Sequence, residues 1–273
     1  MITIIMSTYN GASYLEQQLN SILNQTYEDW RLLVRDDNST DGTLTLLQEY
    51  AERYPEKIRI VDNGGQNLGV VRSFEVLLSE CKDADYVQLA DQDDVWLPEK
   101  LEECMALMLR SEEQYGRQTP VLVHCDLKVV DNDLKDIAPS FWRYVNIRPD
   151  ILDQNVHYLA ICNSVTGCAT LINHAVQQVV LPIGKGVYMH DAWVGLKVLL
   201  SGGHIVALDK PLLLYRQHGD NVCGATPYRF TMTNLREKYV LAQRSYQTAH
   251  PLVFRNYLHF LFWKTCYFFK LHF

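Results

Sequence analysis

Three carboxylates fall within four residues at Asp91-Gln-Asp93-Asp94, directly after the apolar run Tyr86–Ala90. Neighbouring carboxylates repel one another unless a cation or a set of strong hydrogen-bond donors relieves the repulsion. Hard divalent cations such as Mg²⁺ and Mn²⁺ bind these oxygens and keep coordination positions open for substrate phosphates. A solvated acidic turn is the alternative. The position after a predicted buried strand favours a metal–phosphate site.

A second polar segment, residues 36–42, has the sequence Asp-Asp-Asn-Ser-Thr-Asp-Gly and follows another apolar run. A carboxylate at the end of such a strand can accept hydrogen bonds from a base or a ribose. Ser39 and Asp41 need no ligand to explain them, because turns and helix N-caps favour these residue types. Asp36 and Asp37 are therefore the candidate ligand residues of this segment.

The first 130 residues alternate between strand and helix patterns. Apolar β-branched runs predict strands, and apolar residues spaced by three and four predict helices. The predicted strands are 2–6, 30–34, 58–61, 86–90 and 121–125, and the predicted helices are 14–23, a helix opening at 41, 70–78 and 98–109. This alternation predicts an α/β fold with a doubly wound, mixed but mainly parallel sheet. Ligands of such sheets bind beyond the carboxyl ends of the strands.

The pattern loosens after residue 130. Residues 132–160 hold prolines and aromatic residues without a clear period and predict an excursion over the surface. The regular pattern returns over 163–172, and a helix is expected over 191–200. Two further strands, 205–208 and 212–215, are expected on either side of a turn at Asp209-Lys-Pro. From Pro227 onward the chain is predicted to be mainly helical.

Composition limits the classes of protein that this chain can represent. Its 273 residues, 48% apolar and 21% charged, are typical of a folded chain with one large or two small domains. A formal charge of −7 argues against a nucleic-acid partner. The charge is uneven: residues 226–273 carry seven Lys or Arg and one acid, a net +6, whereas residues 1–225 carry 18 and 31, a net −13.

The cysteines and the apolar runs indicate the cellular compartment in which the protein is expected. The seven cysteines are odd in number and scattered without a C-x-x-C pair, which predicts reduced, mostly buried thiols in the cytosol. The N-terminal apolar run is too short for a signal peptide and lacks a basic region before it. No run of about 20 apolar residues is present, so we expect no membrane-spanning helix.

Four segments together resemble a known family. Ser7-Thr-Tyr-Asn, Ile22-Leu-Asn-Gln-Thr-Tyr, residues 36–42 and Asp91-Gln-Asp-Asp, in this order over the first 110 residues, resemble the inverting glycosyltransferases of family 2. These enzymes have the nucleotide-sugar-binding fold named GT-A. Asn67-Leu-Gly-Val-Val-Arg72 also resembles a segment of the family. The resemblance implies a GT-A domain over 1–225, with a nucleotide-sugar-binding half, 1–130, and an acceptor half, 131–225.

The resemblance also implies roles for single residues. The base and ribose would be held by Ser7, Tyr9 and Asp37, and Asn67 and Arg72 would lie near the nucleotide. Asp93 would bind a Mn²⁺ or Mg²⁺ ion that bridges the diphosphate, with Asp91 at the ribose or the metal and Asp94 close by. The implied donor-binding set is Ser7, Tyr9, Asn10, Asp37, Asn67, Arg72, Asp91, Asp94 and Arg216.

A catalytic base is expected at Asp191. The family places an acidic pair, usually Glu-Asp, at the start of a helix, and its second residue is the base; here the pair is His190-Asp191. This departure leaves the role of His190 open. Inverting transfer needs one carboxylate within reach of the acceptor hydroxyl, opposite the leaving diphosphate. The alternative for Asp191 is an acid that is favoured by the helix dipole alone. His190 and Trp193 are expected on the acceptor side.

Two further segments complete the expected site. Tyr215-Arg216-Gln217-His218 resembles the family's late loop, in which the histidine completes the metal shell or meets the diphosphate. Arg216 could bind phosphate oxygens with two parallel hydrogen bonds, whereas a lone histidine is often only a packed residue. Gly167-Cys-Ala resembles the acceptor-side segment under the donor sugar, where glycine allows the backbone to approach the sugar closely.

The tail over 226–273 is basic, aromatic-rich and expected to be an amphipathic helical extension. Such a helix can lie in a bilayer interface next to anionic lipid, or it can pack on the domain or in an oligomer. The expected location is cytoplasmic, at the inner face of the cell membrane.

The expected reaction is transfer of a sugar from a dTDP- or UDP-linked donor to a hydroxyl of a glycan or a lipid-linked precursor. The resemblance points to L-rhamnose as the transferred sugar. Two alternatives stay open: a non-catalytic nucleotide-sugar-binding module, and a metal-dependent phosphohydrolase.

Overall fold

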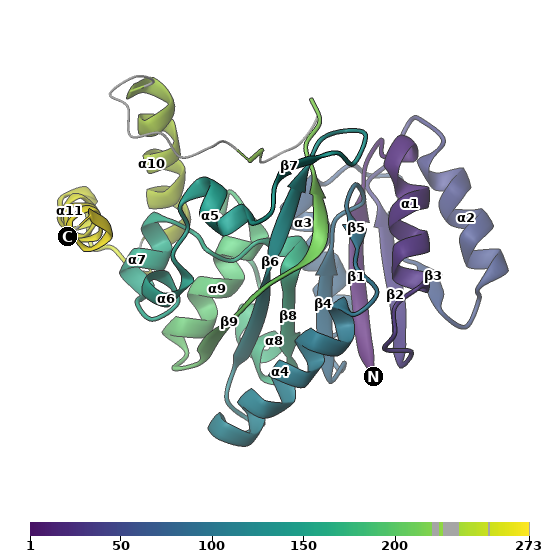
Figure 1. The fold of residues 1–273 in the computed structure, drawn as a ribbon, viewed down its shortest axis with the longest axis horizontal. Helices are drawn as coiled ribbons and strands as arrows, with labels where there is room; N and C mark the ends of the chain where they lie inside the picture. Colours follow the sequence, from purple (N-terminus) through teal and green to yellow (C-terminus); the bar gives the residue numbers. More distant parts are fainter. Residues whose placement is uncertain (220–223, 226–234, 251, 273) are drawn as a thin grey trace.

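The computed structural model describes residues 1–219, 224–225, 235–250 and 252–272 (Figure 1). The strands are β1 (Ile2–Thr8), β2 (Trp30–Asp36), β3 (Ile58–Ile60), β4 (Tyr86–Ala90), β5 (Val95–Trp96), β6 (Val121–Val130), β7 (Asp136–Ala138), β8 (Thr170–Asn173) and β9 (His204–Arg216). The longer helices are α1 (Ala12–Leu23), α2 (Thr43–Arg53), α3 (Val70–Glu80), α4 (Lys100–Tyr115), α9 (His190–Leu200), α10 (Leu235–Ala249) and α11 (Tyr257–His272). The short ones are α5 (Phe141–Val145), α6 (Pro149–Leu152), α7 (Val156–Ile161), α8 (His174–Val180) and the 3₁₀ helix η1 (Gly167–Ala169).

The strands form one mixed sheet in the order β3-β2-β1-β4-β8-β6-β9-β5, with β7 paired to β6. The N-terminal part, β3-β2-β1-β4, is parallel. Strand β8 is antiparallel to both of its neighbours, and β6 returns to a parallel pairing with β9. The doubly wound mixed α/β sheet expected from the sequence is therefore confirmed, and the ends of β1, β2 and β4 meet at one edge.

Two hydrophobic clusters cover the two faces of this sheet. Alternate residues of β1 divide between them, with Ile4 in one cluster and Ile5 in the other, because successive side chains of a strand point to opposite faces. Helices α1, α2 and α4 pack on the first face, and α3, α8 and α9 pack on the second. Burial on both faces explains why the strands read as continuous apolar runs.

The structure corrects two sequence predictions about elements and adds detail to a third. The expected turn at Asp209-Lys-Pro lies inside the single strand β9. The chain stays extended there because the pairing with β6 shifts its register: Cys125 pairs with Leu208 and Asp126 with Pro211. The surface excursion over 132–160 contains β7 and the short helices α5, α6 and part of α7. Helix α2 begins at Thr43, with Gly42 and not Ser39 or Asp41 at its N-cap.

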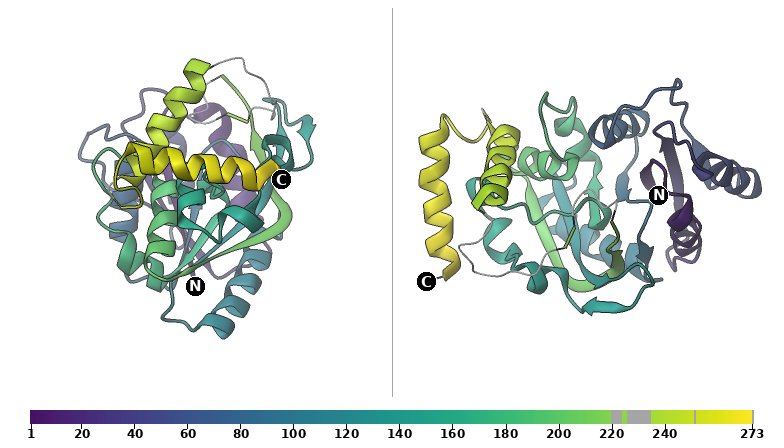
Figure 2. Two further views of the ribbon diagram at one scale, coloured as in Figure 1. Left: turned by 90° about the vertical axis from the view of Figure 1, so that its left-hand side faces the viewer. Right: turned by 90° about the horizontal axis from the view of Figure 1, so that it is seen from above.

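Helices α10 and α11 lie at the end of the molecule opposite α2 and β3 (Figures 1 and 2). The inner side of α11 packs on α7: Trp263 stacks on His157 with ring centroids 4.0 Å apart, and Phe260 is fully buried. The helical character expected of the tail is confirmed in its described part; residues 226–234, where that tail begins, lie outside the described residues. In the described part of the chain, no helix is long and apolar enough to span a membrane.

Candidate active site

A cavity of about 940 Å³ opens at the sheet edge where β1 and β4 end, and extends to α10. It is lined by eleven of the residues expected from the sequence: Ser7, Tyr9, Asn10, Asp37, Asn67, Asp91, Asp93, Gly167, His190, Asp191 and His218. These residues come from seven separate parts of the chain. The fold therefore gathers most of the expected site around one space large enough for a nucleotide sugar.

The loops after β1 and β4 are held together by Gln92. Its side chain accepts a hydrogen bond from the Tyr9 N–H at 2.8 Å and donates one to the Tyr9 carbonyl at 3.0 Å. A Cβ atom on Gly11 would lie 2.3 Å from the Gln92 amide, so a side chain at position 11 would displace Gln92 from Tyr9. Asn10, at a positive φ of 47°, accepts a hydrogen bond from the Thr40 N–H at 2.8 Å. These contacts hold Tyr9 at the cavity wall.

Asp37 ties the third loop to the site. Its carboxylate accepts hydrogen bonds from the Leu68 and Gly69 N–H groups, each at 2.7 Å, and from Arg35 at 2.5 Å. Burial alone would raise the pKa of Asp37, but these hydrogen bonds outweigh it and lower that pKa. Asp36 is a structural residue, since its carboxylate accepts hydrogen bonds from Thr8 and Ser39. Asp37 thus fixes the segment that carries Asn67.

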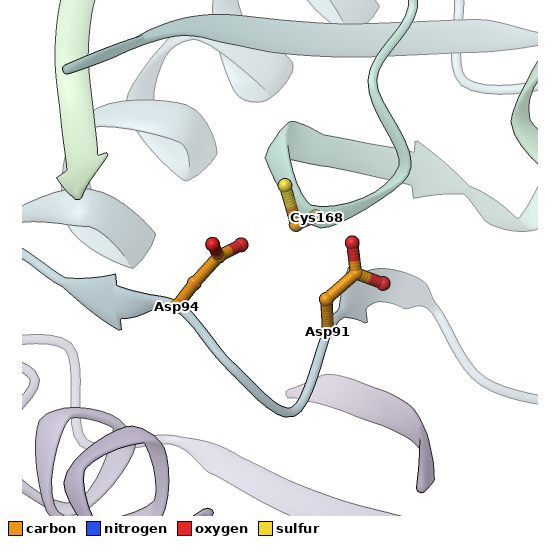
Figure 3. Close-up of side chains that lie close together, drawn as sticks. All are labelled: Asp91, Asp94 and Cys168. Carbon is orange, nitrogen blue, oxygen red and sulfur yellow. The ribbon is translucent and has the colours of Figure 1, made fainter. Parts of the chain in front are cut away.

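The acidic segment 91–94 fits a divalent cation. Asp91, Asp94 and Cys168 offer ligand atoms within 4.8 Å of one another (Figure 3). Burial and the neighbouring charge of Asp93 raise the pKa of Asp91 to about 7 and that of Asp94 well above its usual value. Oδ2 of Asp94 is buried without a hydrogen-bond partner in the described part of the chain. A cation at the carboxylates would relieve this repulsion, and oxygen ligands suit Mg²⁺ and Mn²⁺.

The members of this segment face different ways. Asp91 and Asp93 line the cavity, whereas Asp94 is fully buried behind it. Asp93 Oδ2 lies 2.8 Å from Nε2 of His218, whose ring stacks on Tyr14 with centroids 4.5 Å apart. Cys168 is a poor ligand for a hard cation, because burial raises the pKa of its thiol. The cavity-facing set is therefore Asp91, Asp93 and His218.

Asp191 stands in the same cavity at the start of α9. One carboxylate oxygen accepts a hydrogen bond from the Gly167 N–H at 3.0 Å, and the other accepts one from the Asn163 side chain at 3.3 Å. Burial raises the pKa of Asp191 to about 6, although backbone hydrogen bonds from Ala192 and Gly167 oppose that effect. The result is a carboxylate that is ionised at neutral pH and more basic than an exposed one.

Four of the expected residues do not line the cavity: Arg72, Asp94, Trp193 and Arg216. Arg72 donates hydrogen bonds to the Ile183 and Gly184 carbonyls. Trp193 is a core residue whose indole N–H donates to the Val180 carbonyl at 2.7 Å.

Arg216 is 3% exposed and donates to the carbonyls of Asp93 and Asn132, so it braces the acidic segment 91–94. Asp94 accepts a hydrogen bond from the Arg216 N–H at 3.3 Å. This geometry does not match two predictions: the acceptor-side position of Trp193 and the phosphate contact of Arg216.

Sequence reasoning missed three residues that the structure brings to the site: Gln92, Asn163 and Tyr14. Gln92 lies inside the acidic segment, where the carboxylates give the stronger signal. Asn163 begins the predicted regular segment 163–172 and carries no motif. Tyr14 looks like a helix surface residue, yet its ring lies beneath Arg216, with Cζ 5.0 Å from the ring centroid. Only tertiary contacts identify these three.

Comparison with known proteins agrees with this arrangement. The model of the family described as Glycosyl transferase family 2 matches residues 3–176. The chain is 34% identical over 227 residues to dTDP-rhamnosyl transferase RfbG of Shigella flexneri, covering 81% of this chain and 74% of RfbG. It is 36% identical over 122 residues to EpsE of Bacillus subtilis (strain 168), covering 45% of this chain and 43% of EpsE. The match therefore spans less than half the length of EpsE.

Solved structures share the fold. S. aureus TarS in complex with UDP-GlcNAc superposes with a TM-score of 0.59 at 17% identity, covering 89% of this chain and 66% of that one. The fold and the site together define a glycosyltransferase of the GT-A type. The chain belongs to glycosyl transferase family 2.

Proposed function

We propose that this chain transfers a sugar from a nucleoside diphosphate sugar to an acceptor hydroxyl, with inversion at the anomeric carbon. The observation that carries the proposal is that the buried carboxylate of Asp191 shares one cavity with Asp91 and Asp93. This juxtaposition provides a base for the acceptor on one side and anionic ligands for a cation on the other. A binding module without catalysis has no need of a carboxylate with a pKa of about 6 at the cavity wall.

The residues divide the work of the reaction. Ser7, Tyr9 and Asn67 would contact the nucleotide, with Asp37 fixing the segment that carries Asn67. Asp191 accepts the proton of the acceptor hydroxyl while the hydroxyl oxygen attacks the anomeric carbon. The bond between the anomeric carbon and the diphosphate oxygen breaks on the opposite face. Asp91, Asp93 and His218 would hold a Mn²⁺ or Mg²⁺ ion. When bound, this ion supplies positive charge to the leaving diphosphate.

The donor we favour is dTDP-L-rhamnose. RfbG, which is named a dTDP-rhamnosyl transferase, is 34% identical over four fifths of this chain. A UDP-linked hexose is the alternative donor. The cavity volume of about 940 Å³ accommodates either.

We also place the acceptor at a membrane surface, as a glycan on a lipid-linked precursor. The outer side of α11 exposes five large apolar side chains at helical spacing: Leu258, Leu261, Phe262, Phe268 and Phe269. The sequence holds no acidic residue from 239 to 272, whereas Arg255, Lys264 and Lys270 belong to this region. Apolar residues beside basic ones suit a helix that lies flat in an anionic lipid interface. Such attachment would place the α10 end of the cavity near the lipid.

The experiment that tests the proposed reaction is a panel of dTDP- and UDP-sugars with Mn²⁺, Mg²⁺ or EDTA. Binding to the folded state raises the melting temperature by mass action. Release of the nucleoside diphosphate is then followed with acceptor present, and the anomeric configuration of the product is read by NMR. Retention of configuration, or a cooperative melt that no nucleotide shifts, would contradict the proposal.

A further inference from the structure

His190 is a buried imidazole at the cavity wall. The side chain is 2% exposed, lines the cavity and begins α9. Neither Nδ1 nor Nε2 has a hydrogen-bond partner in the described part of the chain. Burying polar nitrogen atoms without partners is unfavourable, and most such atoms in native proteins are paired with protein, water or ligand. The two nitrogens therefore point to a ligand group.

The ring is held rigidly. Phe74 of α3 stacks on it, with ring centroids 3.8 Å apart and an interplanar angle of 13°. On the side of η1, a Cβ atom added to Gly167 would lie 3.0 Å from Nε2, so any side chain at position 167 would press on the Nε2 edge. The N–H of the same glycine binds Asp191. Nε2 thus lies beside the base, at a fixed position.

The imidazole is neutral throughout the physiological range. Burial lowers the pKa of His190 to about 3. A neutral imidazole donates one hydrogen bond and accepts one. Its natural partner is a hydroxyl group, which can also do both. A carboxylate brought into this enclosed position would gain no compensating charge from the ring and would lose its hydration.

The location favours the donor sugar over the acceptor. Phe74 belongs to α3, which follows the segment that Asp37 fixes, on the donor side of the cavity. The other end of the cavity is lined by Leu241, Ser245 and Thr248 of α10, where an acceptor has room to enter. His190 lies between Phe74 and Gly167, next to Asp191, the carboxylate that must face the anomeric carbon.

We infer that His190 hydrogen-bonds a hydroxyl group of the transferred sugar and selects a neutral sugar over a uronic acid. This inference rests on the proposed function and adds the chemical class of the sugar and the residue that recognises it. A purely structural histidine is the competing explanation. It would leave two buried nitrogens unpaired where a phenylalanine would stack on Phe74 equally well.

The test compares nucleoside diphosphate with nucleotide sugar. Isothermal titration with UDP, UDP-glucose, UDP-glucuronate, dTDP and dTDP-L-rhamnose gives the gain in affinity that the sugar adds to its nucleotide. For wild type we expect a gain for the neutral sugars and less for glucuronate. In His190→Phe the nucleotides should bind within about twofold of wild type while the gain falls about tenfold. His190→Gln, which keeps a donor and an acceptor, should restore part of it.

His204 provides a matched control. Its ring stacks on Tyr115 with centroids 3.7 Å apart and does not line the cavity, so His204→Phe should leave every affinity unchanged. An unchanged sugar gain in His190→Phe overturns the inference, as does an altered acceptor KM with normal donor affinity. Wild-type protein that binds no nucleotide contradicts the proposed function itself.

A second measurement on wild type serves if the His190 variants fail to fold. The ¹⁵N resonances of His190 should shift with the bound neutral nucleotide sugar and stay unchanged with its nucleoside diphosphate. Equal shifts with both ligands overturn the inference.

Discussion

The side-chain amide of Asn163 donates a 3.3 Å hydrogen bond to the carboxylate of Asp191, 28 residues further along the chain. The same Nδ2 donates to the Val165 carbonyl at 2.7 Å, and Asn163 Oδ1 accepts from the Val165 N–H at 3.2 Å. Asn163 is therefore fixed before it meets Asp191. Together with the Gly167 N–H, it orients the carboxylate in advance of acceptor binding.

Asp191→Asn should abolish transfer and spare donor binding. The amide has nearly the shape of the carboxylate but cannot accept the acceptor proton, and positioned general bases contribute roughly 10²- to 10⁴-fold to rate. Turnover is measured as release of nucleoside diphosphate, and donor affinity by isothermal titration. Asp133→Asn, at an exposed acid that does not line the cavity, serves as the control. Near-normal turnover in Asp191→Asn would place the base elsewhere.

The rate of transfer should fall on the acid side of neutrality. Burial raises the pKa of Asp191 to about 6, and the base works only when ionised, so activity should drop as the pH falls through about 6. Asn163→Ala removes a hydrogen bond that favours the ionised form, which should move this limb to higher pH. The measurement is kcat/KM against pH for both proteins. Identical acid limbs would show that Asn163 does not tune Asp191.

Asp93→Asn should remove the dependence of donor binding on Mn²⁺. Asp93 faces the cavity and contacts His218 at 2.8 Å, so the variant loses both an anionic ligand and the partner that orients the imidazole. Loss of even a partner outside the metal shell costs about 10- to 100-fold in metal affinity. Donor titrations with Mn²⁺ and with EDTA should differ for wild type and coincide for the variant. A retained difference contradicts the assignment of Asp93.

Much of the donor half could be predicted from the sequence because its signals are local. The run Ile2–Met6 is apolar since β1 is buried on both faces, and Asp91 and Asp93 follow β4 directly. The rule that strand ends meet at one edge then brings these groups together without knowledge of any contact. Eleven of the fifteen predicted site residues line the cavity. Four of these eleven, Gly167, His190, Asp191 and His218, are predicted by the family resemblance and not by the strand-end rule.

The remaining residues depend on tertiary contacts that no local pattern encodes. Arg216 follows a strand and looks available for phosphate, but it is enclosed by the carbonyls of Asp93 and Asn132. Trp193 stands two residues after Asp191, and helical geometry turns it into the core on the other side of α9. The predicted turn at Asp209 failed because a register shift against β6 absorbs the extra residues without ending the strand.

Asp37→Asn should destabilise the fold, because it leaves the Arg35 guanidinium buried without its counter-charge. Breaking such a buried pair costs about 3–5 kcal/mol, whereas the exposed pair of Asp150 and Arg148 should lose at most about 1 kcal/mol in Asp150→Asn. The folded-state pKa of Asp37 is lowered from 3.8, so its contribution is present above pH 3.8 and is lost as the pH falls through the folded value. Urea unfolding measures both variants at neutral pH. Equal losses would contradict this prediction.

The outer side of α11 should bind lipid through its apolar residues. Phe262 and Phe269 are 60% and 55% exposed and belong to the outer side of the helix, opposite Phe260 and Tyr267, which pack inward. Burying an exposed phenylalanine in lipid contributes about 1.5–3 kcal/mol, so Phe262→Ser with Phe269→Ser should weaken binding to phosphatidylglycerol vesicles by more than about 100-fold.

The control for lipid binding is Leu109→Ser, because Leu109 is equally exposed, at 51%, on α4. This variant should leave vesicle co-sedimentation unchanged. Pure phosphatidylcholine vesicles should bind wild type, the double variant and Leu109→Ser weakly, because the basic residues of this region need anionic headgroups. A self-association that the double variant abolishes, with no vesicle binding by wild type, would instead identify the outer side of α11 as a contact between two copies of the chain. Light scattering in the absence of lipid separates these outcomes, since only the second changes the mass in solution.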